Sequence, residues 1–186
     1  MMMNTAPLFL DLLTGLHHRA YFLDRLSEAA DAAQTGGQAL ALLLVDLDNL
    51  FLINMERGRD SGDRALVALA VTLQRSARPG DTVARLGGDQ FALLLPGTSL
   101  ATATQFACGI RSLVGRAHDV HPDIGMIDVC IGVAARPDRG PWRALDLLAL
   151  ADLRLNSAKR SRHRPGWTQQ VWAEPPDMPD EDDGEG

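Results

Sequence analysis

The stretch Arg85-Leu-Gly-Gly-Asp-Gln-Phe-Ala-Leu-Leu-Leu-Pro96 places a Gly-Gly-Asp turn between two apolar segments. This pattern predicts a β-hairpin. Because glycine has no Cβ, the chain can turn sharply at Gly87 and Gly88, and a ligand phosphate can approach their N–H groups. Asp89 would carry a carboxylate at the hairpin tip, where a Mg²⁺ ion can bridge it to that phosphate. Gln90 follows, and its amide holds no charge, so the stretch predicts a nucleotide site that is weakened at one position.

The composition is that of a globular protein. The chain has 186 residues, of which 46% are hydrophobic and 23% charged, which suits one domain. It has no apolar run of the ~18 residues that a transmembrane helix needs, and no secretory signal. The cysteines, Cys108 and Cys130, have apolar neighbours, so we expect both to be buried and reduced. These features predict a cytoplasmic protein without a membrane segment.

The net charge of −6 comes from the C-terminus. Residues 174–186 hold seven of the 24 acids and no base, which leaves 17 acids against 18 bases in the rest of the chain. A nearly neutral body lacks the basic surface of a nucleic-acid-binding protein. The proline-rich acidic segment is expected to be disordered. We therefore expect an N-terminal lead over residues 1–10, one domain over 11–172 and a disordered acidic tail over 173–186.

Helical and strand patterns alternate along the chain. We expect helices over 18–34, 50–55, 60–78, 99–118 and 142–160, and strands over 39–46, 82–86, 90–95, 126–134 and, at an edge, 167–172. This order predicts an α/β fold in which helices flank a central mixed β-sheet and one hairpin carries the glycine turn.

Asp46 and Asp48 end the first expected strand and are two residues apart, so they share one face of it. Ligands of open α/β sheets bind at such strand ends. Either aspartate alone is better explained as a solvated loop residue. Together with Asp89 beside the glycine turn, they suit a Mg²⁺-nucleotide site.

Taken together, these residues resemble the GGDEF family, the diguanylate cyclase domains, over roughly residues 11–164. The resemblance implies a nucleotidyl-cyclase-like fold. The matching positions are Asp11-Leu-Leu-Thr-Gly-Leu16, Arg19, Phe22, Asp46-Leu-Asp48, Asn54, Gly58, Gly62-Asp63, Arg85-Leu-Gly-Gly-Asp89, Phe91, Cys130-Ile-Gly132, Ala151-Asp152 and Ala158-Lys159.

In active members of that family, two GTP-loaded domains face each other, and each 3′-hydroxyl attacks the other's α-phosphate to give cyclic di-GMP. The resemblance implies that Asp46, Asp89 and the Leu47 carbonyl hold Mg²⁺, which neutralises phosphate charge and acidifies the hydroxyl. Asp89 and Gln90 are the corresponding catalytic positions, and Gln90 stands where the family has a glutamate.

The resemblance also implies the substrate contacts. Asn54 and Asp63 would contact guanine, whose N1–H and N2–H₂ groups suit a carboxylate acceptor. Gly87, Gly88 and Lys159 would lie against the phosphates. Without the resemblance, Asp63 is a first-turn helix acid and Asn54 a turn residue.

Seven positions depart from the family pattern. Leu50 replaces a phenylalanine, and Met55 and Arg59 replace an aspartate and a histidine; the other four weaken the catalytic site. Phe51 replaces a phosphate-directed lysine, Asn156 a tyrosine and His163 an arginine, in addition to Gln90. Losing one charge-assisted contact in a buried site costs about 1.5–3 kcal/mol. We therefore expect a degenerate signature, GGDQF, with little or no turnover, unless neighbouring residues cover these roles.

A second candidate site is Arg78-Pro-Gly-Asp81, which has the form Arg-x-x-Asp. Its aspartate, Asp81, lies six residues before Gly87. In the family this is the inhibitory site for cyclic di-GMP. An arginine grips phosphate, and an aspartate accepts from guanine. Arg85 is a candidate second cation. The plainer interpretation is a solvated turn with proline at its second position.

The sequence leaves three functions open. The first is a degenerate GGDEF domain that binds cyclic di-GMP as a receptor or regulatory module of bacterial second-messenger signalling. The second is a slow diguanylate cyclase that uses GTP. The third is a GTP-binding or protein-interaction module with an unknown protein partner. Ligand bound at Arg78 is expected to promote a homodimer.

Overall fold

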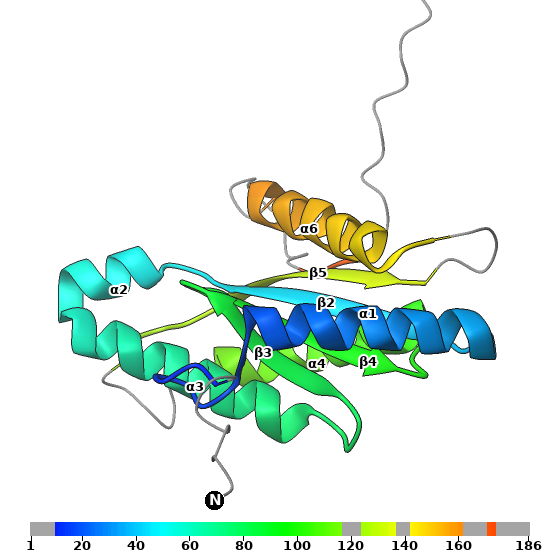
Figure 1. The fold of residues 1–186 in the computed structure, drawn as a ribbon. Helices are drawn as coiled ribbons and strands as arrows, with labels where there is room; N and C mark the ends of the chain where they lie inside the picture. Colours follow the sequence, from blue (N-terminus) through cyan, green and yellow to red (C-terminus); the bar gives the residue numbers. More distant parts are fainter. Residues whose placement is uncertain (1–9, 117–123, 137–141, 162–170, 174–186) are drawn as a thin grey trace, which may run out of the picture.

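In the computed structural model, the chain is described over residues 10–116, 124–136, 142–161 and 171–173. These residues form one mixed sheet of six strands in the order β1-β3-β4-β2-β5-β6 (Figure 1). The central strand β2 (Leu40–Leu47) is antiparallel to both β4 (Gln90–Pro96) and β5 (Val129–Ala135). β3 (Thr82–Gly87) forms the hairpin with β4. The edge strands β1 (His17–His18) and β6 (Val171–Trp172) run parallel to β3 and β5.

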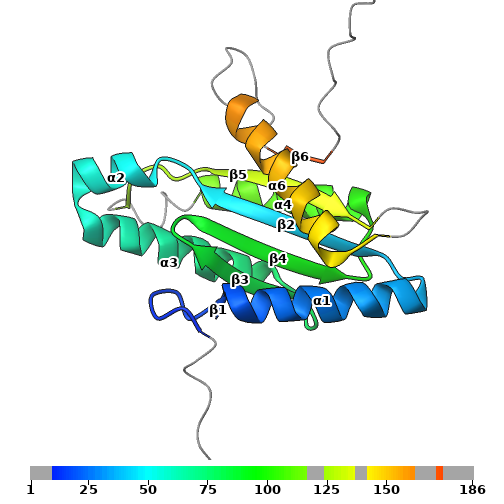
Figure 2. The same ribbon diagram turned by 45° about the horizontal axis from the view of Figure 1, so that its top comes forward.

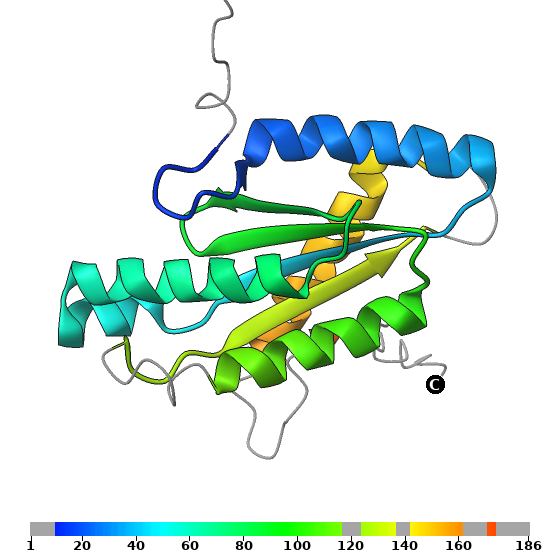
Figure 3. The ribbon, with the colours of Figure 1, turned by 90° about the horizontal axis from the view of Figure 1, so that it is seen from below.

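Helices cover both faces of this sheet. α1 (Arg19–Gly36) and α6 (Ala144–Ser161) lie on one face, and α3 (Arg59–Ser76) and α4 (Leu100–Gly115) on the other (Figures 2 and 3). Every residue of β2 is buried, because a strand covered on both sides alternates its side chains between two cores. α2 (Leu50–Arg57) continues from the end of β2 and packs on α3.

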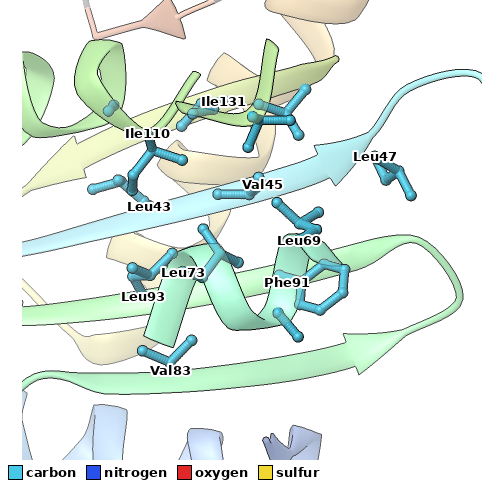
Figure 4. Packing of buried hydrophobic residues seen from close by; sticks show 14 of the residues in the cluster. Leu43, Val45, Leu47, Leu69, Leu73, Val83, Phe91, Leu93, Ile110 and Ile131 are labelled. Atoms are coloured by element: carbon cyan, nitrogen blue, oxygen red, sulfur yellow. The ribbon is translucent and has the colours of Figure 1, made fainter. Parts of the chain in front are cut away.

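The larger core lies between the sheet and the pair α3 and α4. Leu43 and Val45 of β2 point into it, toward Leu69 and Leu73 of α3 (Figure 4). Leu42 and Leu44 point the opposite way, into the core under α1 and α6. Asp46 continues this alternation, so its side chain emerges on the α1–α6 face at the end of the strand.

The helix ends follow local chemistry. The imidazole of His18 accepts hydrogen bonds from the N–H groups of Ala20 and Tyr21 and caps α1. Gly37 ends that helix with φ +63°, a conformation that glycine adopts without strain. Ser99 caps α4 by accepting from the Thr102 N–H.

The α/β fold and its central hairpin are confirmed, with three differences from the sequence expectations. β5 begins at Val129 rather than at 126, although Ile124 and Ile127 are buried. Cys108 is exposed, because it lies on the outer side of α4, whereas Cys130 is buried as expected. β1 was not predicted, because two residues carry no periodic signal.

Some expectations fall outside the described residues. These are the lead before residue 10, the tail after residue 173 and the start of the last expected strand, 167–170. Among the described residues, no helix is both long enough and apolar enough to span a membrane.

Candidate functional site

The two predicted metal-binding carboxylates lie together. Asp46 pairs with Gln90 in the β2–β4 register, and the Leu47 N–H donates to the Asp89 carbonyl oxygen at 3.0 Å. This bond holds the hairpin tip against the end of β2. Asp46, Leu47 and Asp89 accordingly line one pocket of about 370 Å³. The expectation that the strand end and the glycine turn meet is confirmed.

The hairpin turn depends on its two glycines. Gly87 pairs with Gln90, so Gly88 and Asp89 form a two-residue loop. The φ angles of Gly87 and Gly88 are +138° and +56°, which strongly favour glycine. A side chain at either position would therefore strain the turn that presents Asp89.

Arg85 stabilises this turn through hydrogen bonds to its backbone. Its Nε and Nη2 both donate to the Gly88 carbonyl, at 3.1 and 2.7 Å, and its Nη1 lies 3.1 Å from an Asp11 carboxylate oxygen. Asp11 also accepts from the N–H and hydroxyl of Thr14. Arg85 therefore connects the loop before β1 to the glycine turn, and it is absent from the lining of the pocket beside Arg78. Its predicted role as a second cation for cyclic di-GMP stays a prediction.

Lys159, from the last turns of α6, is bound to Asp46. Its Nζ lies 2.6 Å from Asp46 Oδ2. Burial raises the pKa of Asp46 to about 6; the charges of Asp89 and Asp48 raise it too, and the Lys159 hydrogen bond opposes the rise. Lys159 is thus the cation that compensates a crowded group of carboxylates.

The donor set fits Mg²⁺ only in part. Carboxylates of Asp46 and Asp89 and the Leu47 carbonyl are hard oxygen ligands, which Mg²⁺ prefers. Asp48 also lines the pocket, and its carboxylate accepts a hydrogen bond from the Cys130 thiol at 3.2 Å. Within the described ranges, no group of three or more His, Cys, Asp or Glu side chains is placed to hold a metal. A Mg²⁺ ion here would need oxygens from the ligand's phosphates, as is usual for nucleotide sites.

Asn54 and Asp63 lie at the junction of α2 and α3. The Asn54 Oδ1 atom is buried and has no hydrogen-bond partner among the described residues. A Cβ on Gly62 would lie 2.0 Å from that oxygen, so glycine is required for Asn54 to occupy this place. Asp63 is exposed on the first turns of α3. Their predicted guanine contacts stay predictions.

Part of the pocket lining is apolar, including position 51, where the resemblance implies a cation in the family. Phe51, the first residue after Leu50 on α2, is 72% exposed and lines the pocket with Leu52. Among the described residues, Lys159 is the one basic residue in this lining, and it already forms an ion pair with Asp46.

The Arg78–Asp81 turn lies at the other end of β3. The Arg78 N–H donates to Asp81 Oδ2 at 2.8 Å, while the guanidinium reaches the same carboxylate only at 3.4 Å. Arg78 Nη2 also donates to the Thr98 hydroxyl at 2.7 Å. The Arg78 side chain is 57% exposed and that of Asp81 only 3%. The turn presents a cation at the surface over a buried acid.

The family model described as "Diguanylate cyclase, GGDEF domain" matches residues 8–165. The chain belongs to the GGDEF family. The curated relatives include the response regulator PleD of Caulobacter vibrioides, 35% identical over 153 residues, which are 81% of this chain and 34% of PleD. Diguanylate cyclase TpbB of Pseudomonas aeruginosa is 38% identical over 152 residues, which are 81% of this chain and 35% of TpbB. The chain therefore spans about a third of the length of these relatives.

A solved structure supports the same assignment. The GGDEF domain of DgcB from Caulobacter crescentus, determined in complex with c-di-GMP, superposes with a TM-score of 0.81 at 27% identity. The match covers 94% of this chain and 98% of that domain. The predicted fold and family are thus confirmed, and the roles of individual site residues belong to the proposals below.

Proposed function

We propose that this GGDEF domain is a regulatory module that binds cyclic di-GMP through Arg78 and Asp81 and has little or no cyclase activity. The observation that carries the proposal is the exposed Arg78 guanidinium, which has only long contacts to Asp81. Its one short bond, from Nη2 to the Thr98 hydroxyl at 2.7 Å, is to a neutral group, so the guanidinium can exchange it for a phosphate, and Asp81 Oδ1 can then accept from guanine while Oδ2 keeps its bond from the Arg78 N–H. The c-di-GMP complex of the similar DgcB domain makes this ligand the natural choice.

The charge around Asp46 supports the second half of the proposal. Asp46, Asp48 and Asp89 all line the pocket, and among the residues that the structure describes Lys159 is its one basic lining residue and is bound to Asp46. Phe51 and Gln90 each lack a charge that would assist phosphate or metal binding. Stabilising the charge that develops during phosphoryl transfer is the main contribution of such sites, so this deficit predicts slow turnover at best.

Calorimetric titration of the chain with cyclic di-GMP tests the proposal. We expect binding that Arg78→Ala weakens by about 10- to 100-fold, the loss of one or two charge-assisted hydrogen bonds. The backbone bond from residue 78 to Asp81 survives in that variant, so the turn is retained. Arg75→Ala is the matched control, because Arg75 is an exposed arginine of the same helix end. Absence of heat from the wild type, or an unchanged Arg78→Ala, contradicts the proposal.

A slow diguanylate cyclase is the second candidate, favoured by the meeting of Asp46, Leu47 and Asp89 at one pocket. Incubation with GTP and Mg²⁺, followed by chromatography, tests it. Gln90→Glu should raise product formation, because residue 90 lies opposite Asp46 in the register and the new carboxylate would add a metal ligand. A lack of product from both chains rejects this candidate.

A further inference from the structure

A pocket of about 350 Å³ lies between α1 and α6, on the face of the sheet that both helices cover. Small-molecule sites measure roughly 300–1,000 Å³, so this pocket is large enough for a small ligand. Residues of α1 line one side and residues of α6 the other, and the end of the β3–β4 hairpin adds Leu86 and Gln90. The lining shares no residue with the Asp46 pocket or with the pocket beside Arg78, so this is a separate cavity.

Most of the lining is apolar and is not covered by the core. Leu23, Leu86 and Leu148 pack against the core under α1 and α6 but are only partly buried. Leu145 is one turn before Leu148 on α6 and is 64% exposed. Covering apolar surface of this kind is favourable, so the pocket suits a ligand with an apolar group.

Two side chains of opposite charge complete the lining, one from each helix. Arg19 is the first residue of α1, and Asp152 lies in the middle of α6; both are exposed. The Arg19 guanidinium has no hydrogen bond or ion pair with any residue that the structure describes. The first turn of α1 contains no acidic residue, so a bound anion would gain from both Arg19 and the helix dipole.

Asp152 is also able to bind a ligand. Its Oδ2 accepts a hydrogen bond from the Asn156 amide at 3.1 Å. A carboxylate has about four acceptor sites, so this bond leaves capacity for a donor from the pocket.

Arg19 and Asp152 together select for the charge of a ligand. A guanidinium only donates hydrogen bonds, and a carboxylate only accepts them. An anion would be attracted by Arg19 and repelled by Asp152, and a cation would meet the reverse. A molecule that carries both charges pairs with both side chains. Gln90 has donors and an acceptor, so it accommodates either charge and does not contribute to this selection.

We propose that this pocket binds a small zwitterion with an apolar side chain, which is the chemistry of an aliphatic amino acid. The ligand carboxylate pairs with Arg19, its ammonium group pairs with Asp152, and its side chain packs on Leu23 and Leu145. The inference goes beyond the proposed function and does not depend on it, because it uses none of the residues assigned to cyclic di-GMP.

Calorimetric titration of the chain with leucine tests the proposal. Two analogues with the same branched chain serve as probes: 4-methylpentanoate lacks the ammonium group and 3-methylbutylamine lacks the carboxylate. We expect leucine to bind at least about tenfold more tightly than either, because each analogue has lost one charge-assisted hydrogen bond and leaves one charged side chain unpaired. Similar affinity for leucine and an analogue overturns the inference.

Two variants assign each charge to its side chain. Arg19→Met should weaken leucine binding about tenfold or more and leave 3-methylbutylamine binding no weaker than before. Asp152→Asn should weaken leucine binding by a similar factor and leave 4-methylpentanoate binding no weaker. Arg59→Met is the matched control, because Arg59 is likewise an exposed first residue of an 18-residue helix. Unchanged leucine binding in Arg19→Met or in Asp152→Asn overturns the inference.

A measurement on the wild type does not depend on how a variant folds. Gln90 lines the pocket, so its side-chain amide signal in ¹H–¹⁵N spectra should shift on addition of leucine. The signal of Gln105, which is exposed on α4, should not move. An unmoved Gln90 signal at millimolar leucine overturns the inference, and cyclic di-GMP binding at Arg78 is unaffected by that result.

Discussion

Strand β3 separates two turns of opposite electrostatic character. At its start, the Arg78–Asp81 turn presents an exposed guanidinium above a buried acid. At its end, the Gly87–Gly88 turn brings Asp89 to Asp46, whose carboxylate is already bound to Lys159. The first turn can meet a phosphate directly. The second is rich in carboxylates and repels phosphate until a divalent cation lies between them. Under the proposed function, the turn at the start of this hairpin would bind its ligand without metal and the turn at its tip would need one.

Gly62→Ala should produce the largest difference between the two turns, by weakening ligand binding at one of them and not at the other. The new Cβ would lie 2.0 Å from Asn54 Oδ1, so Asn54 must leave its place. We expect the affinity for GTP in the presence of Mg²⁺ to fall at least about 30-fold, with cyclic di-GMP binding at Arg78 retained. Titration with each ligand measures both effects.

Gly109→Ala is the control for that substitution. Gly109 is on α4, and an added Cβ there would meet no atom within 4 Å. Alanine in an exposed helix position should raise the free energy of unfolding by about 0.5–1 kcal/mol and leave both ligands unaffected. If Gly109→Ala also lost GTP binding, the loss in Gly62→Ala could be a general effect of substituting a helix glycine and would not be due to displacement of Asn54.

Removing Mg²⁺ should weaken ligand binding at the Gly87–Gly88 turn and leave binding at the Arg78–Asp81 turn nearly unchanged. With a chelator present, we expect GTP binding at Asp46 and Asp89 to weaken about tenfold or more, because the two carboxylates then face the phosphates directly. Cyclic di-GMP binding should change by less than twofold. The measurement is a pair of titrations with and without EDTA. An equal response of both ligands would show that the two turns do not differ as described.

Lys159→Met should destabilise the chain in a pH-dependent way. It leaves the Asp46 carboxylate without its cation, at a cost of about 1–2 kcal/mol, because the pair is partly screened by solvent. The pKa of Asp46 in the folded chain, about 6, already lies above its ordinary value of 3.8, so the native state favours the protonated form. Stability from this group is full below about pH 4 and is lost as the pH rises through 6.

Losing Lys159 raises that pKa further, so the deficit should be largest above pH 7 and should nearly close at pH 4. Urea unfolding at pH 8 and pH 4 measures it. A deficit of the same size at both pH values would mean that Lys159 stabilises α6 by packing rather than by pairing with Asp46.

Arg85→Lys should have the smallest effect. A lysine cannot donate to the Gly88 carbonyl and reach Asp11 together as the guanidinium does, so we expect a loss of about 0.5–1 kcal/mol in unfolding free energy. GTP binding should weaken slightly and cyclic di-GMP binding not at all. A clear loss of cyclic di-GMP affinity would instead place Arg85 with Arg78, as the sequence spacing suggested.

The parts of the site that could be predicted from the sequence are those whose contacts are local or lie in a strand register. Asp46 and Asp89 are such a case, because a strand end and a hairpin tip meet wherever the two strands pair. The pairing of Lys159 with Asp46 crosses more than a hundred residues and depends on how α6 lies over the sheet. The contact of Arg85 with Asp11 could not be predicted for the same reason, since Asp11 lies 74 residues earlier in the chain.

Burial was harder to predict than element type. Cys108 and Cys130 both have apolar neighbours in the sequence, yet only Cys130 is buried, because a central strand has no outer face and a surface helix does. The requirement for Gly62 is likewise invisible in its neighbours, since it comes from the approach of Asn54 on another helix.

Lys159 is the single lysine of the chain. It is therefore the one side chain in this sequence that an amine-reactive reagent can acylate, and it is 38% exposed. The rate at which Lys159 is acylated, measured by mass spectrometry, reports on the Asp46 pocket. We expect acylation to be slow while the ion pair with Asp46 is intact and faster when Asp46 is neutralised. A nucleotide that covers the amine should suppress it. No label or engineered residue has to be introduced to follow occupancy of the signature turn.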